Sequence, residues 1–311
     1  MRFTRIIKNK INNIIANNII YFNEVQHLTN LMLNTNKIGI DKLFSINNSK
    51  VIVSLTTYNK RIYDVYLAIE SIMQQTVKPS KIILWLDENE FRPDNIPNSL
   101  ILQQKRGLEI RFCANIKSYK KLIPTLKNYS NDIIITIDDD VIYPFDLVER
   151  LLKGYYTDPK CIYFTRGHKI RINENGLPLP YREWHIDAIG NQDQCPFAKD
   201  LRGYDMLSFP TGIGGILYPP NSLHHEVLNE NVFMKICPNA DDVWFKAMSL
   251  INGTYCRQVY IEKPFYEKFL VIQDGQDIAL NITNYKNNGN DMQIKAVLQK
   301  YNINFNNYDL K

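Results

Sequence analysis

Three consecutive carboxylates are the feature of this sequence best suited to chemistry. Asp138, Asp139 and Asp140 directly follow the apolar run IIITI, residues 133–137. Adjacent carboxylates repel one another, more so when buried, and therefore need good solvation or a cation. In extended backbone Asp138 and Asp140 point to one side and Asp139 to the other. Mn²⁺ and Mg²⁺ often take one or two carboxylates together with phosphate oxygens, so the pattern predicts an ion shared with a diphosphate.

Helix capping is the simpler interpretation of the same carboxylates. A helical pattern begins near Pro144, and Asp140 or Asp146 could cap it. Capping uses one carboxylate and leaves three in a row after a buried strand unexplained. We therefore favour metal and phosphate binding.

A second acidic pair, Asp241–Asp242, precedes another helical pattern. Its apolar positions are Trp244, Ala247, Met248 and Ile251. Either carboxylate could simply cap that helix, and taken alone the pair supports only this interpretation. A carboxylate that does not bind the metal is nevertheless what transfer to a hydroxyl group requires, because a general base must take the proton as the bond forms.

Strand and helix patterns alternate between residues 50 and 156. The alternation predicts an α/β fold with a mainly parallel sheet flanked by helices. Ligands bind such sheets at the carboxyl ends of the strands. The expected strands cover residues 51–55, 82–86, 108–112 and 133–137, and the expected helices residues 62–76, 101–104, 120–129 and 145–155.

Polar residues follow three of these strands. The three aspartates follow the fourth strand, the run Thr56–Thr57–Tyr58 follows the first, and Asp87–Glu88 follows the second. Since parallel strands end at one edge of the sheet, these groups should lie near one another.

The pattern becomes less regular after residue 160. A strand is expected at residues 161–166, a turn at Asn175–Gly176 and a helix near residues 292–301. The predicted organisation is a helical, partly mobile arm, one α/β domain with a smaller mixed region in its second half, and a polar tail with one helix. Their bounds are residues 1–49, 50–270 (halves 50–156 and 157–270) and 271–311.

The stretch TGIGGILYPP, residues 211–220, contains three closely spaced glycines. Glycine lets the backbone approach a ligand closely, but a bulged strand explains the stretch equally well. Nearby residues offer surfaces on which sugars can stack and form hydrogen bonds, although they could equally be ordinary core residues. They are His168, Tyr181, Trp184 and His185.

Composition excludes several classes of protein. The chain has 311 residues, of which 45% are hydrophobic, so a globular core is expected. A net charge of +5 does not indicate nucleic-acid binding. The five cysteines are odd in number and lack a C-x-x-C pair, which argues against a disulfide framework or zinc site and fits the cytoplasm.

The N-terminal stretch MRFTRIIKNKINNIIANNII is basic and lacks the apolar core and cleavage site of a signal peptide. No apolar run in the chain has membrane-spanning length. We favour a surface helix or a mobile arm for this stretch. The alternative is a basic amphipathic element in peripheral contact with the inner, anionic face of a membrane.

Taken in order, the motifs resemble family 2 glycosyltransferases, which have the GT-A fold. The shared features are the strand and turn ending Thr56–Thr57–Tyr58–Asn59, the helix ending Gln75–Thr76, the D-x-D-like IIITIDDDVIYP and the later acidic pair in ADDVWFK. The elements SLTTY, KKLIP, DDDVIYP, PTGIGG-LYPP and ADD-W are similar to those of bacterial surface-polysaccharide transferases. The resemblance covers about residues 50–260 and is carried by order and spacing.

This resemblance implies a GT-A, Rossmann-like fold with a nucleotide-sugar-binding half and an acceptor-side half. It implies a metal-dependent glycosyltransferase that moves a sugar, with inversion, from a UDP-sugar to a hydroxyl of a glycan or lipid-linked acceptor. Capsule, O-antigen or lipooligosaccharide synthesis is the implied pathway.

The resemblance also assigns roles to residues. Asp242, beside Asp241, is the implied base, and Asp140 with Asp138 the implied ligand of Mn²⁺ or Mg²⁺. The implied donor-binding residues are Thr56, Thr57, Tyr58, Arg61, Asp87, Lys120, Lys121, Asp138 and Asp139. Residue type, and not the resemblance, places His168, Trp184, Gly214 and Gly215 on the acceptor side.

Several features depart from the family pattern. The second strand ends in Leu86–Asp87–Glu88 instead of Asp-Asp-Gly-Ser, and no histidine follows His225 to serve as a late metal ligand. The Gln-x-x-Arg-Trp motif of processive synthases is absent, which argues against a membrane-embedded polymerase.

Two other functions remain open at the level of sequence. A nucleotidyltransferase or another Mg²⁺-dependent phosphoryl-transfer enzyme would also use clustered aspartates. The chain lacks G-x-x-x-x-G-K-[ST] and an early Gly-rich, basic signature, which argues against that class. An inactive carbohydrate- or nucleotide-binding scaffold is the third possibility, and the intact acidic residues argue against it.

Overall fold

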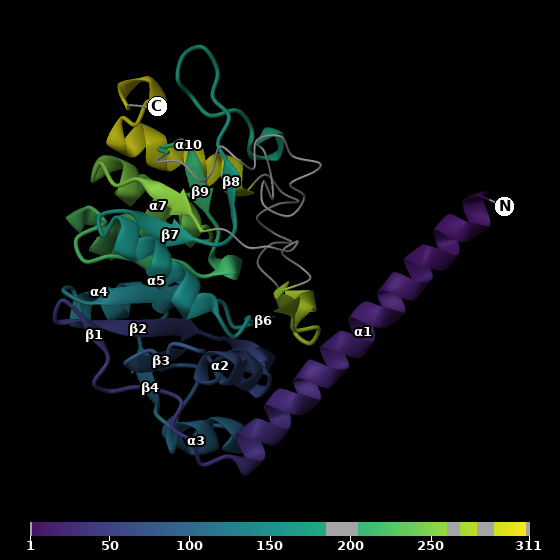
Figure 1. Ribbon diagram of the computed structural model, residues 1–311. Helices are drawn as coiled ribbons and strands as arrows, with labels where there is room; N and C mark the ends of the chain where they lie inside the picture. Colours follow the sequence, from purple (N-terminus) through teal and green to yellow (C-terminus); the bar gives the residue numbers. More distant parts are fainter. Residues whose placement is uncertain (1, 185–204, 260–267, 279–288, 309–311) are drawn as a thin grey trace.

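The computed structural model describes residues 2–184, 205–259, 268–278 and 289–308, with side chains in the first helix from residue 15 onward. Figure 1 shows a layered body of sheet and helices from which the long N-terminal helix α1 (Arg2–Asn34) projects. His185, predicted from sequence as a possible sugar contact, and Cys195, one of the five cysteines, lie outside the described residues.

The described strands form one eight-stranded sheet with the order β11-β7-β10-β5-β2-β3-β4, and β1 at its side. Its first half consists of four parallel strands, as expected. The inner three are largely apolar runs buried on both faces, whereas the edge strand at residues 108–113 is only partly buried. These strands are β2 (Ser49–Thr56), β3 (Lys81–Asp87), β4 (Leu108–Cys113) and β5 (Ile133–Thr136), and β1 (Ser45–Ile46) pairs antiparallel with β2.

The second half of the chain completes the same sheet. Strand β10 (Ile216–Tyr218) lies antiparallel to both β5 and β7 (Ile162–Phe164), with Ile216 opposite Thr136. Strand β11 (Cys256–Gln258) then runs parallel to β7. The mainly parallel α/β sheet with a smaller mixed region is therefore confirmed, and its two halves share one sheet.

The strand order reverses beside β2. The chain runs outward from β2 to β3 and β4, then returns to place β5 on the other side of β2. Adjacent connections leave such a reversal point in opposite directions and open a crevice there, at the carboxyl ends of the strands. Thr56 at the end of β2 and the aspartates after β5 thus border the same crevice.

Helices cover both faces of the sheet. Because side chains alternate along a strand, Val53 and Ile135 face one helical layer, whereas Ile134 and Phe164 face the other. The first layer contains α2 (Val65–Met73), α3 (Asn98–Gln104) and α5 (Leu147–Thr157). The second contains α4 (Ile123–Asn128), α6 (Glu230–Ile236), α7 (Asp241–Ile251) and α10 (Gly289–Tyr301).

Two expected helices are shorter than their apolar patterns. The pattern at residues 62–76 divides into the 3-10 turn η1 (Asn59–Tyr63) and α2. The pattern at residues 120–129 divides into η3 (Lys117–Lys121) and α4, because Pro124 occupies the first turn of α4, where it is tolerated. The turn at Gly176 and the helix over residues 292–301 are confirmed.

Short elements complete the described structure. The strand pairs are β6 (Val141–Ile142) with β12 (Leu270–Val271), and β8 (Gly167–Lys169) with β9 (Ser208–Pro210). The remaining 3-10 turns are η2 (Pro93–Asn95), η4 (Tyr181–Glu183), η6 (Gly212–Gly214), η7 (His225–Leu228), η8 (Gln276–Ile278) and η9 (Phe305–Asn307). The β6–β12 pair brings the beginning of the expected tail onto the body, beside the three aspartates.

Helix α1 packs on the body through its C-terminal half. Tyr21 and Leu28 are buried in a cluster with Leu67 and Ala68 of α2, and with Ile142 and Ile272. In the part of the chain that the structure describes, no helix is both long and apolar enough to cross a membrane. The four described cysteines are free.

A buried ion pair joins helix α2 to the residues that follow helix α3. Arg106 donates to both carboxylate oxygens of Glu70 on α2, at 2.8 and 2.9 Å, and also to the Lys37 carbonyl at 2.8 Å. Gln103 of α3 donates to the same carboxylate at 3.0 Å. Neither charged side chain has more than 4% of its surface exposed, so each depends on the other for compensation.

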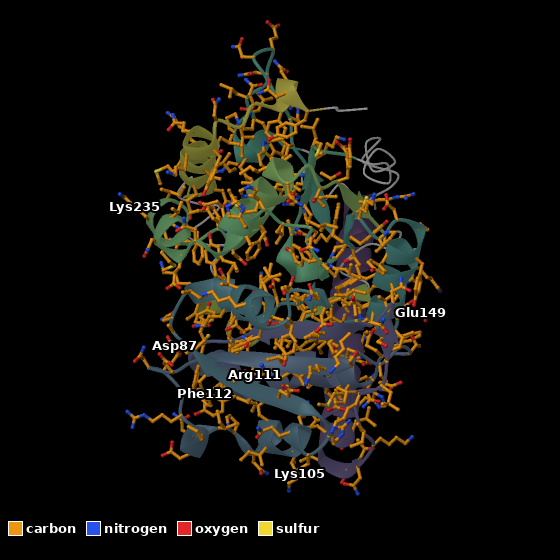
Figure 2. The ribbon with its side chains drawn as sticks, turned by 90° about the vertical axis from the view of Figure 1, so that its left-hand side faces the viewer. Asp87, Lys105, Arg111, Phe112, Glu149 and Lys235 are labelled. Carbon is orange, nitrogen blue, oxygen red and sulfur yellow. The ribbon has the colours of Figure 1, made fainter. Side chains whose placement is uncertain are left out.

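Replacing Glu70→Gln should destabilise the protein by ~3–5 kcal/mol, because Arg106 would remain as an uncompensated buried charge. Urea unfolding measures the effect. The matched control is Glu149→Gln, which removes a surface pair with Lys153 and lies at the edge of the molecule in Figure 2. The control should change stability little, and equal effects of the two substitutions would contradict the prediction.

Candidate active site

A cavity of about 1010 Å³ opens at the strand-order reversal. Its walls come from the end of β2, the loop after β5, η3, η6 and the start of α7. Thirteen of the residues singled out from sequence line it, namely Thr56, Thr57, Tyr58, Arg61, Lys120, Lys121, Asp138, Asp139, Asp140, His168, Tyr181, Asp241 and Asp242. The fold thus brings the two acidic motifs, about a hundred residues apart, to one cavity.

Asp139 ties the ends of β2 and β5 together. Its carboxylate accepts from Thr57 Oγ1 at 2.6 Å and from Arg61 Nη1 at 2.8 Å. Burial raises the pKa of Asp139 to about 6, with Arg61 acting against the rise. Because Asp139 is only 7% exposed and both its oxygens have partners, it is the most structural of the three aspartates.

Asp140 faces the cavity beside the C-terminal segment 268–278. Arg61 Nη2 lies 3.1 Å from its Oδ2, and Gln276 Nε2 donates to the same oxygen at 3.1 Å. The backbone N–H of Ile272 also donates to the Asp140 carbonyl at 2.8 Å. The segment that sequence assigned to a polar tail therefore forms one wall of the site.

Lys121 is the centre of the opposite side of the cavity. Its Nζ lies 3.0 Å from Asp138 Oδ1, 2.9 Å from Asp241 Oδ2 and 3.9 Å from Asp242 Oδ1. Burial opposes the charge, but the three carboxylates outweigh burial and hold the pKa of Lys121 well above its usual value. One ammonium group therefore compensates acids from two distant segments.

Asp242 is the carboxylate best placed to act as a base. Its Oδ2 accepts from the Gly212 N–H at 3.1 Å, whereas its buried Oδ1 makes no hydrogen bond to any described residue. Burial, then Asp241 and Asp138, raise the pKa of Asp242 to about 7, although Lys121 and Gly212 act against the rise. A carboxyl with this pKa can accept a proton near neutral pH.

Asp241 is a partner of Asp242 rather than a second base. Ser118 Oγ donates to its Oδ1 at 2.8 Å, and Lys121 lies against its Oδ2. Both carboxylates lie in the first turn of α7, but no side-chain cap is formed there. The capping interpretation of this pair is therefore wrong for the side chains, although their position still suits the helix dipole.

The predicted donor-binding residues separate into two groups. Tyr58 and Lys120 line the cavity, and Thr56 does so while its Oγ1 donates to the Trp85 carbonyl at 2.8 Å. Asp87 does not line the cavity. Its side chain accepts from the Asn89 N–H at 2.9 Å and closes the turn after β3. Asp87 is labelled in Figure 2.

The predicted acceptor residues also separate. His168 lines the cavity with Tyr181 and Phe209, and its ring stacks parallel to that of Phe209 at a centroid distance of 6.2 Å. Burial, together with Arg166, lowers the pKa of His168 to about 3, so the imidazole is neutral. A neutral imidazole between aromatic rings is a suitable surface for a sugar.

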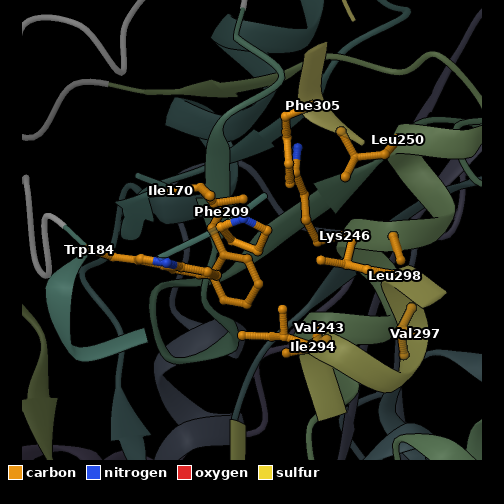
Figure 3. Close-up of a pocket in the computed structure, with 12 residues that line it drawn as sticks. Ile170, Trp184, Phe209, Val243, Lys246, Leu250, Ile294, Val297, Leu298 and Phe305 are labelled. Atoms are coloured by element: carbon orange, nitrogen blue, oxygen red, sulfur yellow. The ribbon is translucent and has the colours of Figure 1, made fainter. Parts of the chain in front are cut away.

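Trp184 lines a different, smaller space. Figure 3 shows it beside Phe209 at an apolar cavity of about 20 Å³, next to α7 and α10. It is 5% exposed, and its indole N–H donates to the Leu179 carbonyl at 2.8 Å. Its place is therefore in the core beside the site, because its ring completes the aromatic cluster behind Phe209.

Of the three glycines in residues 211–220, Gly212 lines the cavity, whereas Gly214 and Gly215 shape the backbone behind it. A Cβ on Gly212 would lie 2.5 Å from Lys121 Nζ, so glycine permits the close approach of this backbone to the charged cluster. A Cβ on Gly214 would meet the Arg166 backbone nitrogen at 2.8 Å, and Gly215 has a φ of +84°. Gly214 and Gly215 do not line the cavity, and they explain the fold of η6 into β10.

Sequence reasoning missed several cavity residues. Gln276 follows no strand that the sequence predicts, and it belongs to no periodic apolar pattern. Its position at the cavity is shown by the β6–β12 pairing and by its hydrogen bond to Asp140. Ser118 stands beside the noted Lys120–Lys121 pair and could have been suspected from it. The cavity also includes Arg166, Phe209, Asn239 and Asn290.

The donor set fits a divalent ion of the kind expected. Asp138 and Asp140 present hard oxygen ligands to the cavity, with 29% and 16% of their side chains exposed. One or two carboxylates with phosphate oxygens and water satisfy Mn²⁺ or Mg²⁺. Among the described residues no group of three histidine, cysteine or acidic side chains could hold a metal alone, so the ion would depend on its bound diphosphate.

Comparisons with known proteins add a general likeness in fold. No family model matches the chain, and no curated protein matches it. A solved CMP:2-keto-3-deoxy-manno-octonic acid synthetase complexed with CTP is similar with a TM-score of 0.38 and 13% identity, covering 68% of this chain and 89% of that one.

A mannosyltransferase from Pyrobaculum calidifontis, PcManGT in complex with GDP-Man and Mn²⁺, is similar with a TM-score of 0.43 and 13% identity. The match covers 79% of this chain and 65% of that one. At this identity the likenesses concern the fold alone.

Replacing Lys121→Met should destabilise the protein by ~3–5 kcal/mol at pH 8, because the buried Asp241 and the partly buried Asp138 and Asp242 lose their shared cation. The loss should shrink toward pH 5, since protonation of Asp242, whose pKa is already about 7, removes part of the uncompensated charge. Denaturant unfolding at both pH values measures this.

The matched control for that substitution is Lys117→Met. Lys117 lies in the same 3-10 turn, and its exposed ammonium group donates to the Asn239 side chain at 2.7 Å. It should show a small, pH-independent effect, and an equal loss for Lys121→Met at pH 5 and pH 8 would contradict the electrostatic explanation.

Proposed function

We propose that this protein is a metal-dependent glycosyltransferase of the GT-A type, which moves a sugar from a nucleotide sugar to a hydroxyl group with inversion. The observation that carries the proposal is one cavity with two separate carboxylate functions. Asp138 and Asp140 lie at the strand-order reversal, and Asp242 lines the same cavity from the start of α7, with 27% of its side chain exposed. A nucleotide sugar needs the first function for its diphosphate and a hydroxyl acceptor needs the second.

The donor occupies the β2 side of the cavity in this proposal. Thr56, Thr57 and Tyr58 follow β2 and border the space where a base and ribose fit, and the motif resemblance favours UDP. Lys120 supplies positive charge there. Asp87 acts on the donor through Lys120, whose charge it favours while burial opposes it.

Asp140, with Asp138, would hold Mn²⁺ or Mg²⁺ on the diphosphate. The ion, when bound, would stabilise the negative charge that develops on the leaving nucleoside diphosphate. Arg61 positions the Asp140 carboxylate, because its guanidinium group lies 2.8 Å from Asp139 and 3.1 Å from Asp140. Arg61 and Lys121 also leave the site less negative, which favours entry of an anionic donor.

Asp242 acts as the general base. The Gly212 N–H orients the Asp242 carboxylate, which lines the cavity with 27% of its side chain exposed and takes the proton of the acceptor hydroxyl. As this proton is transferred, the acceptor oxygen bonds to the anomeric carbon from the face opposite the diphosphate, and the bond from that carbon to the diphosphate oxygen breaks, which inverts the configuration. Lys121 keeps Asp241 and Asp138 compensated, so that proton transfer is directed to Asp242.

The acceptor occupies the side of the cavity formed by His168, Tyr181 and Phe209. Neutral, aromatic surfaces of this kind suit sugar rings. A glycan or lipid-linked glycan in bacterial capsule, O-antigen or lipooligosaccharide synthesis agrees with the motif resemblance.

The donor is identified by thermal unfolding with UDP-, GDP-, CMP- and dTDP-sugars, each with and without Mn²⁺. One nucleotide class should raise Tm in a metal-dependent way, because only the folded state binds it. Release of the free nucleoside diphosphate during turnover supports glycosyl transfer. Release of pyrophosphate would instead assign the site to nucleotidyl transfer, and binding with no turnover on any acceptor would indicate a scaffold.

Replacing Asp242→Asn should lower kcat roughly 10²–10⁴-fold while leaving the donor-induced Tm shift unchanged, because only proton transfer is altered. In the wild type, kcat/KM should fall as the pH decreases through about 7, since the base must be ionised and burial raises its pKa to about 7. A variant that retains wild-type kcat, or a pH profile flat between 5 and 8, would exclude Asp242 as the base.

A further inference from the structure

The part of α1 that precedes Tyr21 leaves the body of the protein. Residues 15–20 are all exposed, and Tyr21 is the first buried residue among the side chains described from residue 15 onward. Figure 1 shows this part of the helix extending away from the sheet and its covering helices. At 1.5 Å per residue the free part of the helix spans roughly 28 Å.

An apolar stripe runs along this helix on a face other than the packed one. Ile15, Ile19 and Phe22 follow one another at helical spacing of four and three residues, so they share a face. Their side chains are 52%, 55% and 62% exposed. Tyr21 and Leu28, by contrast, pack on the body. A continuous exposed apolar face on a helix marks a surface for a partner.

Positive charge is concentrated at the free end of the same helix. The first ten residues contain four cations, Arg2, Arg5, Lys8 and Lys10, and the first acidic residue is Glu24. The whole chain has a net charge of +5, so the other 301 residues together contribute only +1. The partner must therefore accept both an apolar stripe and a cluster of cations.

A second copy of this chain fits these features poorly. Parallel pairing of two α1 helices would place their cationic ends against each other. Antiparallel pairing would offer each cationic end only Glu24 as an acidic partner within the helix. An anionic lipid surface fits well, because it takes the cations at its headgroups and the apolar side chains at the acyl boundary.

We propose that the free half of α1 docks on an anionic membrane surface. The helix lies along the surface and does not cross it, in keeping with the absence of a helix long and apolar enough to span a membrane in the described chain. This inference stands without the proposed catalytic function, since it uses no residue of the cavity.

Co-sedimentation of the full-length protein with lipid vesicles tests the proposal. The protein should bind vesicles of phosphatidylcholine mixed with phosphatidylglycerol, and should bind phosphatidylcholine vesicles much less. Raising the salt concentration should weaken binding to the anionic vesicles, because exposed charges are screened.

Two sets of α1 variants separate charge from apolar contact. Arg2→Gln, Arg5→Gln, Lys8→Gln and Lys10→Gln together should weaken binding at least tenfold, since each cation near an anionic surface contributes roughly fivefold. Ile15→Asn, Ile19→Asn and Phe22→Asn together should also weaken binding about tenfold or more. An unchanged Tm shows that the body still folds.

Matched controls keep the outcome specific to α1. The charge control is the combination Lys50→Gln, Lys127→Gln, Lys160→Gln and Lys235→Gln, which removes the same charge from exposed positions elsewhere. Leu43→Asn removes an exposed apolar side chain, 91% exposed, outside α1. Both controls should bind anionic vesicles like the wild type.

Three results would overturn the proposal. They are wild-type protein that does not bind anionic vesicles, equal binding to neutral and anionic vesicles, and α1 variants that bind as well as the wild type. Light scattering without vesicles tests the alternative of self-association. If the protein forms an oligomer, and if the substitutions at Ile15, Ile19 and Phe22 dissociate it, the stripe binds a second copy of the chain instead.

Discussion

The site depends on compensation of buried carboxylates by two buried cations. Lys121 links Asp138 after β5 to Asp241 and Asp242 on α7, and Arg61 links Asp139 and Asp140 to the turn after β2. Without these cations the acids could not share one cavity, because like charges in a low-dielectric setting repel strongly. The two halves of the chain are therefore held together at the site by charge as well as by the sheet.

This compensation also separates the chemistry of the carboxylates. Asp139 has both oxygens engaged, Asp140 shares one oxygen with Arg61 and Gln276, and Asp242 retains an oxygen without a hydrogen bond. In the proposed reaction, acids of one type thereby become a structural tie, a cation ligand and a proton acceptor. The raised pKa of Asp242, caused first by burial, follows from the same arrangement. Environment, more than residue type, sets each role.

The sequence predicts the local elements well and the long-range contacts only in part. Apolar runs such as residues 133–137 identify the parallel strands, and strand ends identify Thr57 and Asp138, because these signals are local. Gln276 could not be found, since its place depends on the pairing of two-residue strands far apart in sequence. Trp184 and Gly214 were assigned to the acceptor by residue type, but their contacts are with the core, and only packing shows this.

The projecting helix and the cavity meet through the C-terminal segment 268–278. Tyr21 Oη of α1 accepts from the Gln273 N–H at 3.1 Å, and Ile272 packs in the cluster with Leu28. The neighbouring N–H of Ile272 bonds the Asp140 carbonyl, and Gln276 reaches the Asp140 carboxylate. The helix thus fixes one wall of the cavity at the aspartate that faces the diphosphate in the proposed reaction. Docking of α1 on a surface would therefore hold this side of the cavity at a set distance from that surface, where an acceptor anchored in lipid can reach it.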